Sequence, residues 1–315
     1  MRIVIPGGTG QLGRVLARWF RSQGHHVDLI GRRVDDERLR WDGRTDGPWF
    51  EAIDGADVVI NLAGRSVNCR YHWPNLNEMM RSRIDSAQAV GRAIAAASRA
   101  PRVWLQASTA TIYAHNLGEP FGEDGVLGGL EPDVPAYWGY SVHIARAWEL
   151  ALAAAPTPNT RKVALRTGFM MSPDPGGVFD VLMWLARRGL GGSFYGGQQF
   201  VSWLYDEDLL EIVRFLIDHD EVEGPVNLTA PEPLPNHAFM AALRSAAGVP
   251  VGLPVLPGMA ELGARWLGTD VELMRKSRRV VPTRLLDAGY VFRQPSWPEA
   301  SRRLVSRWRT GELLA

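Results

Sequence analysis

The sequence predicts an α/β fold, in which a doubly wound parallel sheet carries a smaller, mixed C-terminal subdomain for substrate. Two observations support this class. Short apolar runs alternate with amphipathic stretches through the first half of the 315-residue chain. A glycine-rich turn, GGTGQLG at 7–13, separates the first apolar run from the first amphipathic one. Strands that alternate with helices form a parallel sheet covered on both faces, and right-handed crossovers wind it in both directions.

The first half divides into strands and helices by its apolar pattern. The predicted strands are short apolar runs, most of them rich in β-branched residues and several closed by turn residues, at 2–6, 25–33, 57–64, 102–109 and 162–172. The predicted helices repeat apolar residues with a period of 3.6, at 11–24, around 49–53, at 75–98 and at 140–155. Together these elements predict the sheet and its covering layers.

After residue 172 the pattern loosens. A helix is predicted at 178–189, a short strand and a helix within 200–217, and a late strand at 224–231. Asp206 or Asp208 is the expected N-cap of the helix within 200–217, and Asn236 is expected to cap the helix after it.

The domain organisation follows from this change of pattern. We expect residues 1–172, completed by about 200–230, to form the nucleotide-binding core. Residues 173–199 and 231–315 are expected to form the smaller substrate subdomain.

Composition excludes several classes of partner. The net charge of +1 gives no field that would draw the chain to nucleic acid or to an anionic membrane. Cys69 is the only cysteine, so no internal disulfide can form and a reducing compartment is favoured. The N-terminus lacks a secretory leader pattern, and no apolar run approaches the roughly 20 residues that span a bilayer. We therefore predict a cytoplasmic protein with no metal, a monomer or a homodimer, that acts on a small molecule.

The glycine-rich turn is the strongest functional signal. Gly7 permits a tight turn, Gly10 lets backbone N–H groups approach a pyrophosphate, and Gly13 lets the helix lie close to the strand. Because the turn joins a strand to a helix, it predicts a dinucleotide site of the Rossmann type. Thr9, Gln11 and Leu12 complete this loop.

The end of the second strand predicts which dinucleotide is bound. A carboxylate there would hold a ribose hydroxyl and repel a 2′-phosphate, but this strand ends in Arg32 and Arg33. Two guanidiniums favour a phosphate, so NADP(H) is preferred over NAD(H). Asp42, next to Trp41, is a further candidate on the adenine side, although packing explains this pair equally well.

A combination of motifs resembles one known family. The turn GGTGQLG, the strand end NLAG at 61–64, STATIY at 108–113 and KVALRTG at 162–168 are similar to the extended short-chain dehydrogenase/reductase family. FVSWLYDEDL at 200–209 and the segment 276–300 resemble, more narrowly, its atypical branch of epimerase family proteins, which carry a small C-terminal domain. The resemblance covers nearly the whole chain.

The resemblance implies roles for further residues. Leu62, Ala63 and Gly64 would line the adenine and ribose side of the cofactor. Ser108 and Thr109 would deliver the hydroxyl that polarises a substrate carbonyl. In the family a tyrosine then transfers the proton, and a lysine four residues later lowers the pKa of that tyrosine.

This sequence departs from the family at that lysine. Tyr140 is followed at the same offset by Ile144, and no tyrosine stands four residues before either of the two lysines of the chain, Lys162 and Lys276. His143, one turn after Tyr140, is the better placed substitute cation, with Arg146 as another. Tyr113 is a second candidate proton donor, and packing explains it as well.

Two interpretations of function stay open. The first is an NADP(H)-dependent oxidoreductase or epimerase that acts on a small or nucleotide-linked carbonyl or hydroxyl compound. Its proton chemistry would use Thr109 with Tyr113 or Tyr140. The second is a non-catalytic NADP(H)-binding sensor or scaffold, which the missing lysine also fits. The loop 65–73 leaves a strand end where such sheets place ligands, and its polar residues either face a substrate or form a solvated rim.

Overall fold

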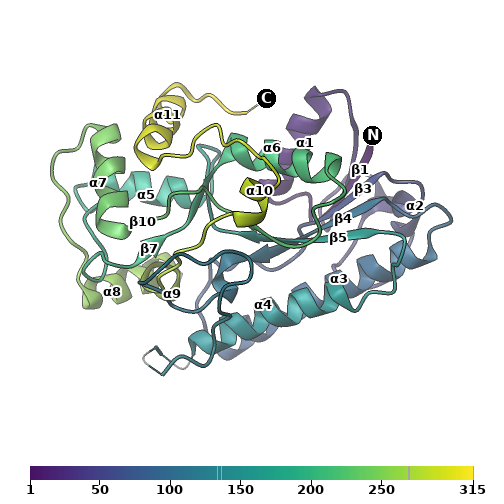
Figure 1. Ribbon diagram of the computed structural model, residues 1–315, viewed down its shortest axis with the longest axis horizontal. Helices are drawn as coiled ribbons and strands as arrows, with labels where there is room; N and C mark the ends of the chain where they lie inside the picture. Colours follow the sequence, from purple (N-terminus) through teal and green to yellow (C-terminus); the bar gives the residue numbers. More distant parts are fainter. Residues whose placement is uncertain (133, 136, 269, 315) are drawn as a thin grey trace.

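A parallel sheet forms the centre of the molecule (Figure 1). The computed structural model describes residues 1–315 except residues 133, 136, 269 and 315. Within them the sheet has the strand order β2-β1-β3-β4-β5-β9, all parallel. Its strands are β1 (Arg2–Pro6), β2 (His26–Ile30), β3 (Val58–Asn61), β4 (Val103–Thr109), β5 (Arg161–Thr167) and β9 (Gly224–Leu228). The order reverses next to β1, which confirms the doubly wound class.

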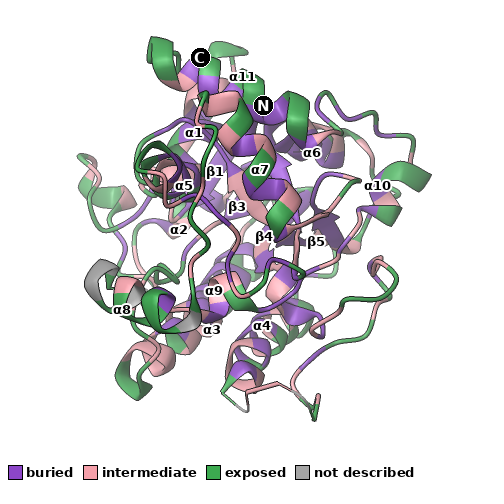
Figure 2. Ribbon diagram, turned by 90° about the vertical axis from the view of Figure 1, so that its left-hand side faces the viewer, coloured by how far each residue is buried: buried purple, intermediate pink, exposed green. Residues whose placement is uncertain are grey.

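Helices cover both faces of this sheet. One face carries α1 (Gln11–Ser22), α6 (Asp206–Asp218) and α10 (Thr283–Asp287), and the other carries α2 (Phe50–Ile53), α3 (Trp73–Ala96) and α4 (Trp138–Ala153). In β1, Ile3 and Ile5 pack against the first layer while Val4 packs against the second. Burial on both faces explains why the strand is apolar throughout. Figure 2 shows the buried strands at the centre, with exposed residues on the outer faces of the helices.

The remaining elements gather mainly at one end of the sheet, on the left of Figure 1. They are β6 (Phe169–Met171), β7 (Phe200–Val201), β8 (Trp203–Tyr205), β10 (Leu234–Pro235), α5 (Val178–Arg187), α7 (Asn236–Ala247), α8 (Pro257–Leu267), α9 (Glu272–Arg275) and α11 (Trp297–Thr310). Two short 3-10 turns stand apart from these elements: η1 (Glu37–Leu39) follows β2, and η2 (Ala110–Ile112) follows β4. A separate apolar cluster holds this end together, and in it Phe239 stacks on Trp297 at 4.0 Å between ring centroids. The predicted domain division stays a prediction.

The predicted strand at 162–172 is interrupted in the structure. Gly168 separates β5 from β6, and a Cβ atom at this position would lie 2.7 Å from the carbonyl oxygen of Ser202. Beyond Gly168 the chain leaves the central sheet, because β6 pairs with β8. The close approach of backbone to backbone at this point requires glycine.

Both predicted helix N-caps are wrong. Tyr205 is the N-cap of α6 and Pro235 that of α7. Asp206, Asp208 and Asn236 are instead buried and make tertiary contacts. Asp206 pairs with Arg307, Asp208 accepts hydrogen bonds from the backbone N–H groups of Arg293 and Gln294, and Asn236 accepts one from the N–H of Phe194.

The sheet ends at β9, which begins with Gly224 and Pro225. Gly224 has a φ of +72°, a conformation that favours glycine. Pro225 pairs with Ala164 of β5 and has no backbone N–H to donate. None of the helices built from the described residues combines the length and the apolar composition needed to cross a bilayer.

We expect Arg307→Ala to destabilise the protein strongly. Arg307 and Asp206 are 9% and 0% exposed in their side chains and lie 2.9 Å apart, joining α11 to α6. Removing the arginine leaves a buried carboxylate without its cation, which costs about 3–5 kcal/mol of unfolding free energy. Urea unfolding measures this loss. Arg303→Ala, at an exposed position on the same helix, is the control. If both variants lose equally little unfolding free energy, the Arg307–Asp206 pair does not stabilise the protein as we expect.

Candidate active site

The glycine loop brings three parts of the core together. Gly7 has a φ of +78°, and a Cβ atom there would lie 2.5 Å from the backbone nitrogen of Ala63. A Cβ atom at Gly13 would lie 2.5 Å from the Cα of Gly8. No side chain fits at either position, so the loop can close on the end of β3 and α1 can lie close to the loop.

Gly10 leaves the start of α1 open. It is the N-cap of this 12-residue helix, and the nearest atom to a Cβ built there is the carbonyl oxygen of Gly7 at 3.5 Å. The N–H of Arg14 donates to the carbonyl oxygen of Gly10, so the amides between them lie at the free end of the helix. Free amides at the positive end of a helix dipole suit a phosphate, and the residues present therefore fit a dinucleotide.

The side chains of the loop hold it in place. Thr9 lies against Gly31 at the end of β2, 3.2 Å from where a Cβ atom of that glycine would be. Gln11 donates from Nε2 to the carbonyl oxygen of Asp174, in the segment after β6. Leu12 packs against the apolar cluster below α1.

The candidate phosphate-binding arginines follow β2 directly. Arg32 and Arg33 are exposed, and neither forms a hydrogen bond or an ion pair with any other described residue. Asp42 is engaged within its own loop, where its Oδ1 accepts from the backbone N–H groups of Arg44 and Thr45. Burial alone would raise the pKa of Asp42, but these hydrogen bonds outweigh it and hold the pKa below its ordinary value.

The NLAG turn at 61–64 links the loop to the interior. Leu62 donates from its backbone N–H to the carbonyl oxygen of Pro6, and Ala63 from its own to Asn61 Oδ1. A Cβ atom at Gly64 would lie 3.4 Å from the side chain of Arg83. The glycine loop is thus continuous, through this turn, with Arg83 of α3.

Arg83 lines a cavity of about 260 Å³ at the carboxyl ends of β4 and β5. Trp148 and Phe169 form apolar parts of its wall. Residues with hydroxyl groups line it from β4, η2, α4, β5 and the loop 65–73, and they include Thr109 and Ser141. Ligands of doubly wound sheets bind outside the carboxyl ends of the strands, so this position is that of an active site.

Of the two predicted hydroxyls at the end of β4, Thr109 is the available one. Both Ser108 and Thr109 line the cavity. Ser108 donates its hydroxyl to Glu149 Oε1 at 2.6 Å, whereas Thr109 Oγ1 only accepts, from the N–H of Thr111 at 3.2 Å. The hydroxyl hydrogen of Thr109 is therefore left for a ligand.

Tyr113 lies outside the cavity, in a buried polar network. Its hydroxyl donates to Asn227 Oδ1 at 2.8 Å and accepts from Arg166, which also forms an ion pair with Glu149. Burial raises the pKa of Tyr113, although Arg166 works against this. The Tyr113 hydroxyl both donates and accepts within this network, and its role as a proton donor stays a prediction.

Tyr140 and His143 also lie off the cavity wall. The Tyr140 ring makes edge contacts with Trp73 and His143, at 5.5 and 6.3 Å between centroids, and His143 is exposed. The residues of α4 that line the cavity are Ser141, Ile144 and Trp148, which share one helix face. The helix α4 therefore places Ser141, and not its neighbour Tyr140, on the cavity wall.

Sequence analysis missed the carboxyl group behind Ser141. The Ser141 hydroxyl donates to Glu272 Oε2 at 2.8 Å, and Glu272 is 1% exposed. Burial raises the pKa of Glu272 to about 7, against the attraction of Arg278. The α4 periodicity could have identified Ser141, but Glu272 lies 131 residues further along the chain and no local pattern marks it.

A lysine reaches this region from the C-terminal segment as well. Lys276 is 2% exposed and donates from Nζ to the carbonyl oxygen of Thr111 at 2.9 Å. Burial lowers its pKa to about 8, and Arg278 acts in the same direction. In the sequence, Glu272 and not a tyrosine stands four residues before Lys276, so the family's tyrosine–lysine spacing does not identify this lysine. The fold brings that pair to the cavity from outside the core.

The loop 65–73 has exposed polar residues, which is one of the two alternatives that its sequence left open. Its polar members Arg65, Asn68, Arg70 and His72 are exposed, as a solvated rim would be. Its cavity-lining residues are instead Val67 and Tyr71. Across the described part of the chain, no group of three or more His, Cys, Asp and Glu side chains is placed to hold a metal ion.

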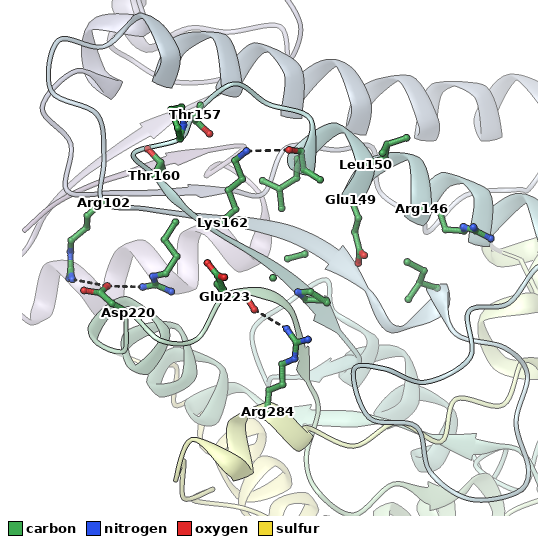
Figure 3. Close-up of a pocket in the computed structure, with 18 of the residues that line it drawn as sticks. Arg102, Arg146, Glu149, Leu150, Thr157, Thr160, Lys162, Asp220, Glu223 and Arg284 are labelled. Carbon is green, nitrogen blue, oxygen red and sulfur yellow. Dashed lines mark hydrogen bonds and ion pairs between the residues drawn. The ribbon is translucent and has the colours of Figure 1, made fainter.

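A larger hollow of about 1140 Å³ lies elsewhere, along α4, β5 and β9 (Figure 3). It is wide open, and several of its charged groups already have partners. Arg102 and Arg161 lie near Asp220, at 3.9 and 3.3 Å, and Arg284 donates to the carbonyl oxygen of Glu223. Its lining includes Arg161 and Gly224, at the amino ends of β5 and β9, whereas the smaller cavity lies at the carboxyl ends of β4 and β5, so we assign the active site to the smaller cavity.

Comparison with known proteins agrees with this architecture. The sequence model of the NAD dependent epimerase/dehydratase family matches residues 3–228, and that of a domain of unknown function, DUF1731, matches residues 262–304. Epimerase family protein SDR39U1 of Bos taurus is 30% identical over 97% of this chain and 100% of its own. Epimerase family protein YfhF of Bacillus subtilis is 27% identical over 98% and 100%.

A solved structure extends the comparison to three dimensions. The crystal structure of human epimerase family protein SDR39U1 with NADPH superposes with a TM-score of 0.82, at 25% identity, over 97% of this chain and 99% of that one. The family match covers more than half of the chain and contains the glycine loop and both strands that end at the cavity. The chain therefore belongs to the NAD dependent epimerase/dehydratase family, within the extended short-chain dehydrogenases/reductases.

Proposed function

We propose that this chain is an NADP(H)-dependent oxidoreductase or epimerase that acts on a small carbonyl or hydroxyl compound. The observation that carries the proposal is the continuity of the glycine loop, through Ala63 and Gly64, with the hydroxyl-lined cavity beside Arg83. One end of this path suits a pyrophosphate and the other a polar substrate. A nicotinamide dinucleotide bound along it supplies or accepts a hydride.

The preference for NADP(H) rests on Arg32 and Arg33. Both side chains are exposed beside the glycine loop, and their guanidiniums have no protein partner among the described residues. A 2′-phosphate would provide the missing acceptor, through charge-assisted hydrogen bonds. The related human protein, whose structure was solved with NADPH, supports the same choice.

The residues at the cavity suggest which groups transfer a proton to or from the substrate. Thr109 keeps a free hydroxyl hydrogen and would orient the substrate oxygen. Ser141 stands on the cavity wall with its hydroxyl bonded to Glu272, a carboxyl group whose raised pKa keeps a proton available near neutral pH. We assign to this serine–carboxyl pair the proton transfer that a tyrosine and a lysine perform in the wider family, with Lys276 as the nearby cation.

A sensor or scaffold without turnover is the second candidate. It is favoured by the position of Tyr140, the tyrosine at the start of α4, which does not line the cavity. Both the enzyme and the sensor require the same cofactor site. Turnover of a substrate is therefore the property that distinguishes them.

We expect NADPH to bind more tightly than NADH, by about tenfold or more for each charge-assisted contact to the 2′-phosphate. The double change Arg32→Ala with Arg33→Ala should erase the preference in a calorimetric titration. Arg302→Ala with Arg303→Ala removes the same charge from exposed positions on α11 and should leave it intact. Equal affinities for the two cofactors in the unchanged protein would refute the arginine argument.

Ser141→Ala should lower kcat/KM by about 10²–10⁴, the usual contribution of a positioned proton donor. NADPH oxidation with a panel of carbonyl compounds measures it, and the affinity for NADPH should stay the same. Tyr140→Phe is the matched control and should retain turnover. If Tyr140→Phe abolishes turnover and Ser141→Ala does not, the tyrosine is the donor; if no compound is turned over, the sensor is favoured.

Glu272→Gln should change the dependence of stability on pH. The pKa of Glu272 rises from 4.5 to about 7 on folding, so the folded state holds a proton that the unfolded state releases between these values. Stability is therefore lost as pH rises from 4.5 to 7. The variant lacks this group, and its Tm relative to the unchanged protein should increase over that window in scanning calorimetry. A Tm difference between the two proteins that stays constant from pH 4.5 to 7 would show that Glu272 of the folded protein is ionised throughout this range.

A further inference from the structure

Two buried arginines line the cavity, and neither has an acidic partner. Arg83 is 8% exposed and Arg278 is 4% exposed. Within the described residues, neither lies in an ion pair, and no aspartate or glutamate belongs to the cavity lining. A buried charge is costly unless it is paired. Because the described residues supply no anion in the cavity lining, an anionic ligand would stabilise these two arginines.

The contacts of Arg278 leave one end of its guanidinium unused. Nε donates to Thr111 Oγ1, and Nη1 donates to the carbonyl oxygens of Leu273 and Lys276. Nη2 is buried and has no hydrogen-bond partner. Burial lowers the pKa of Arg278, against the attraction of Glu272. Three hydrogen bonds to neutral groups fix the side chain and leave Nη2 of this cavity-lining residue without a partner among the described residues.

Arg83 approaches the cavity from α3. Its Nη1 donates to the carbonyl oxygen of Met79, and its guanidinium lies over the Trp148 ring, 4.9 Å from the centroid. Burial lowers its pKa to about 10, so Arg83 still carries its charge at neutral pH. Tyr71, which also lines the cavity, is close enough for its phenol to affect the pKa of both arginines.

The described lining of the cavity carries positive charge without a carboxylate. Arg83 and Arg278 line it, and the nearest buried carboxyl group, Glu272, is partly protonated at neutral pH because burial raises its pKa to about 7. An anionic ligand would offset the charge of the arginines. The volume of about 260 Å³ is below the roughly 300–1,000 Å³ of pockets for drug-sized ligands, which favours a compact compound over a nucleotide-linked sugar.

We propose that the substrate is a small organic acid, held by its carboxylate on Nη2 of Arg278, with Arg83 as the second cation. A planar guanidinium is well matched to a carboxylate. The substrate assignment rests on the proposed function, whereas the carboxylate site itself does not require the cofactor. The carboxylate would place the rest of the compound beside the hydroxyls of Thr109 and Ser141.

The probes that test this site are acetate and its uncharged counterpart acetamide, added without cofactor. Acetate should raise the Tm in a saturable way relative to chloride at equal ionic strength, and acetamide should not. Arg278→Gln should weaken acetate binding by about tenfold or more, because a charged hydrogen bond is lost. Arg275→Gln removes an exposed charge from the same segment and should have no effect.

A second variant covers the case in which Arg278→Gln does not fold. Arg83→Met removes a buried charge and should raise the Tm of the ligand-free protein while weakening the response to acetate. The proposal is overturned if acetate gives no saturable response, if both arginine variants respond like the unchanged protein, or if inorganic phosphate binds better than acetate. Loss of NADPH affinity in Arg278→Gln would also overturn it, because the arginine would then serve the cofactor. Failure of NADPH to bind the unchanged protein would instead refute the proposed function and leave the acetate result standing.

Discussion

The attachment of the segment 276–280 to the end of β4 is the constraint on which the active site depends. Lys276 and Arg278 bond to Thr111 from one side, and Ser202 donates to the carbonyl oxygen of Arg278 from the other. The segment is thus held between the sheet and the β7–β8 region. Without it, the cavity would lose Arg278, and the chain that follows Glu272 would lose its attachment to the sheet.

The fold could be predicted from sequence because its signals are local. Apolar runs such as residues 2–6 mark strands by composition, and the glycine loop requires glycine for reasons that short segments reveal, as the contact of Gly7 with Ala63 shows. Most predicted elements lie within a few residues of the observed ones. The caps failed because Asp206 and Asp208 are used for tertiary contacts, which a cap rule does not include.

The catalytic candidates were harder to predict because tertiary contacts decide which hydroxyl is free. Ser108 and Tyr113 both occur in a motif typical of active sites, yet Glu149 and Arg166 engage their hydroxyl groups. That network links β4, α4 and β5 and supports the cavity from behind. Glu272 and Arg278 could not be predicted as site residues for a different reason. Their hydrogen-bond partners Ser141 and Thr111 lie more than 130 residues away in the chain.

The edge of the sheet bears on how copies of this chain can associate. An unpaired strand offers amides and carbonyls to any extended segment, and this is a common route to fibrous aggregation. The edge strand β9 begins with Gly224 and Pro225. Glycine has a low strand propensity, and proline has no amide hydrogen to donate to a neighbouring strand. A continuous sheet that runs from β9 of one copy into the next copy is therefore disfavoured at this border.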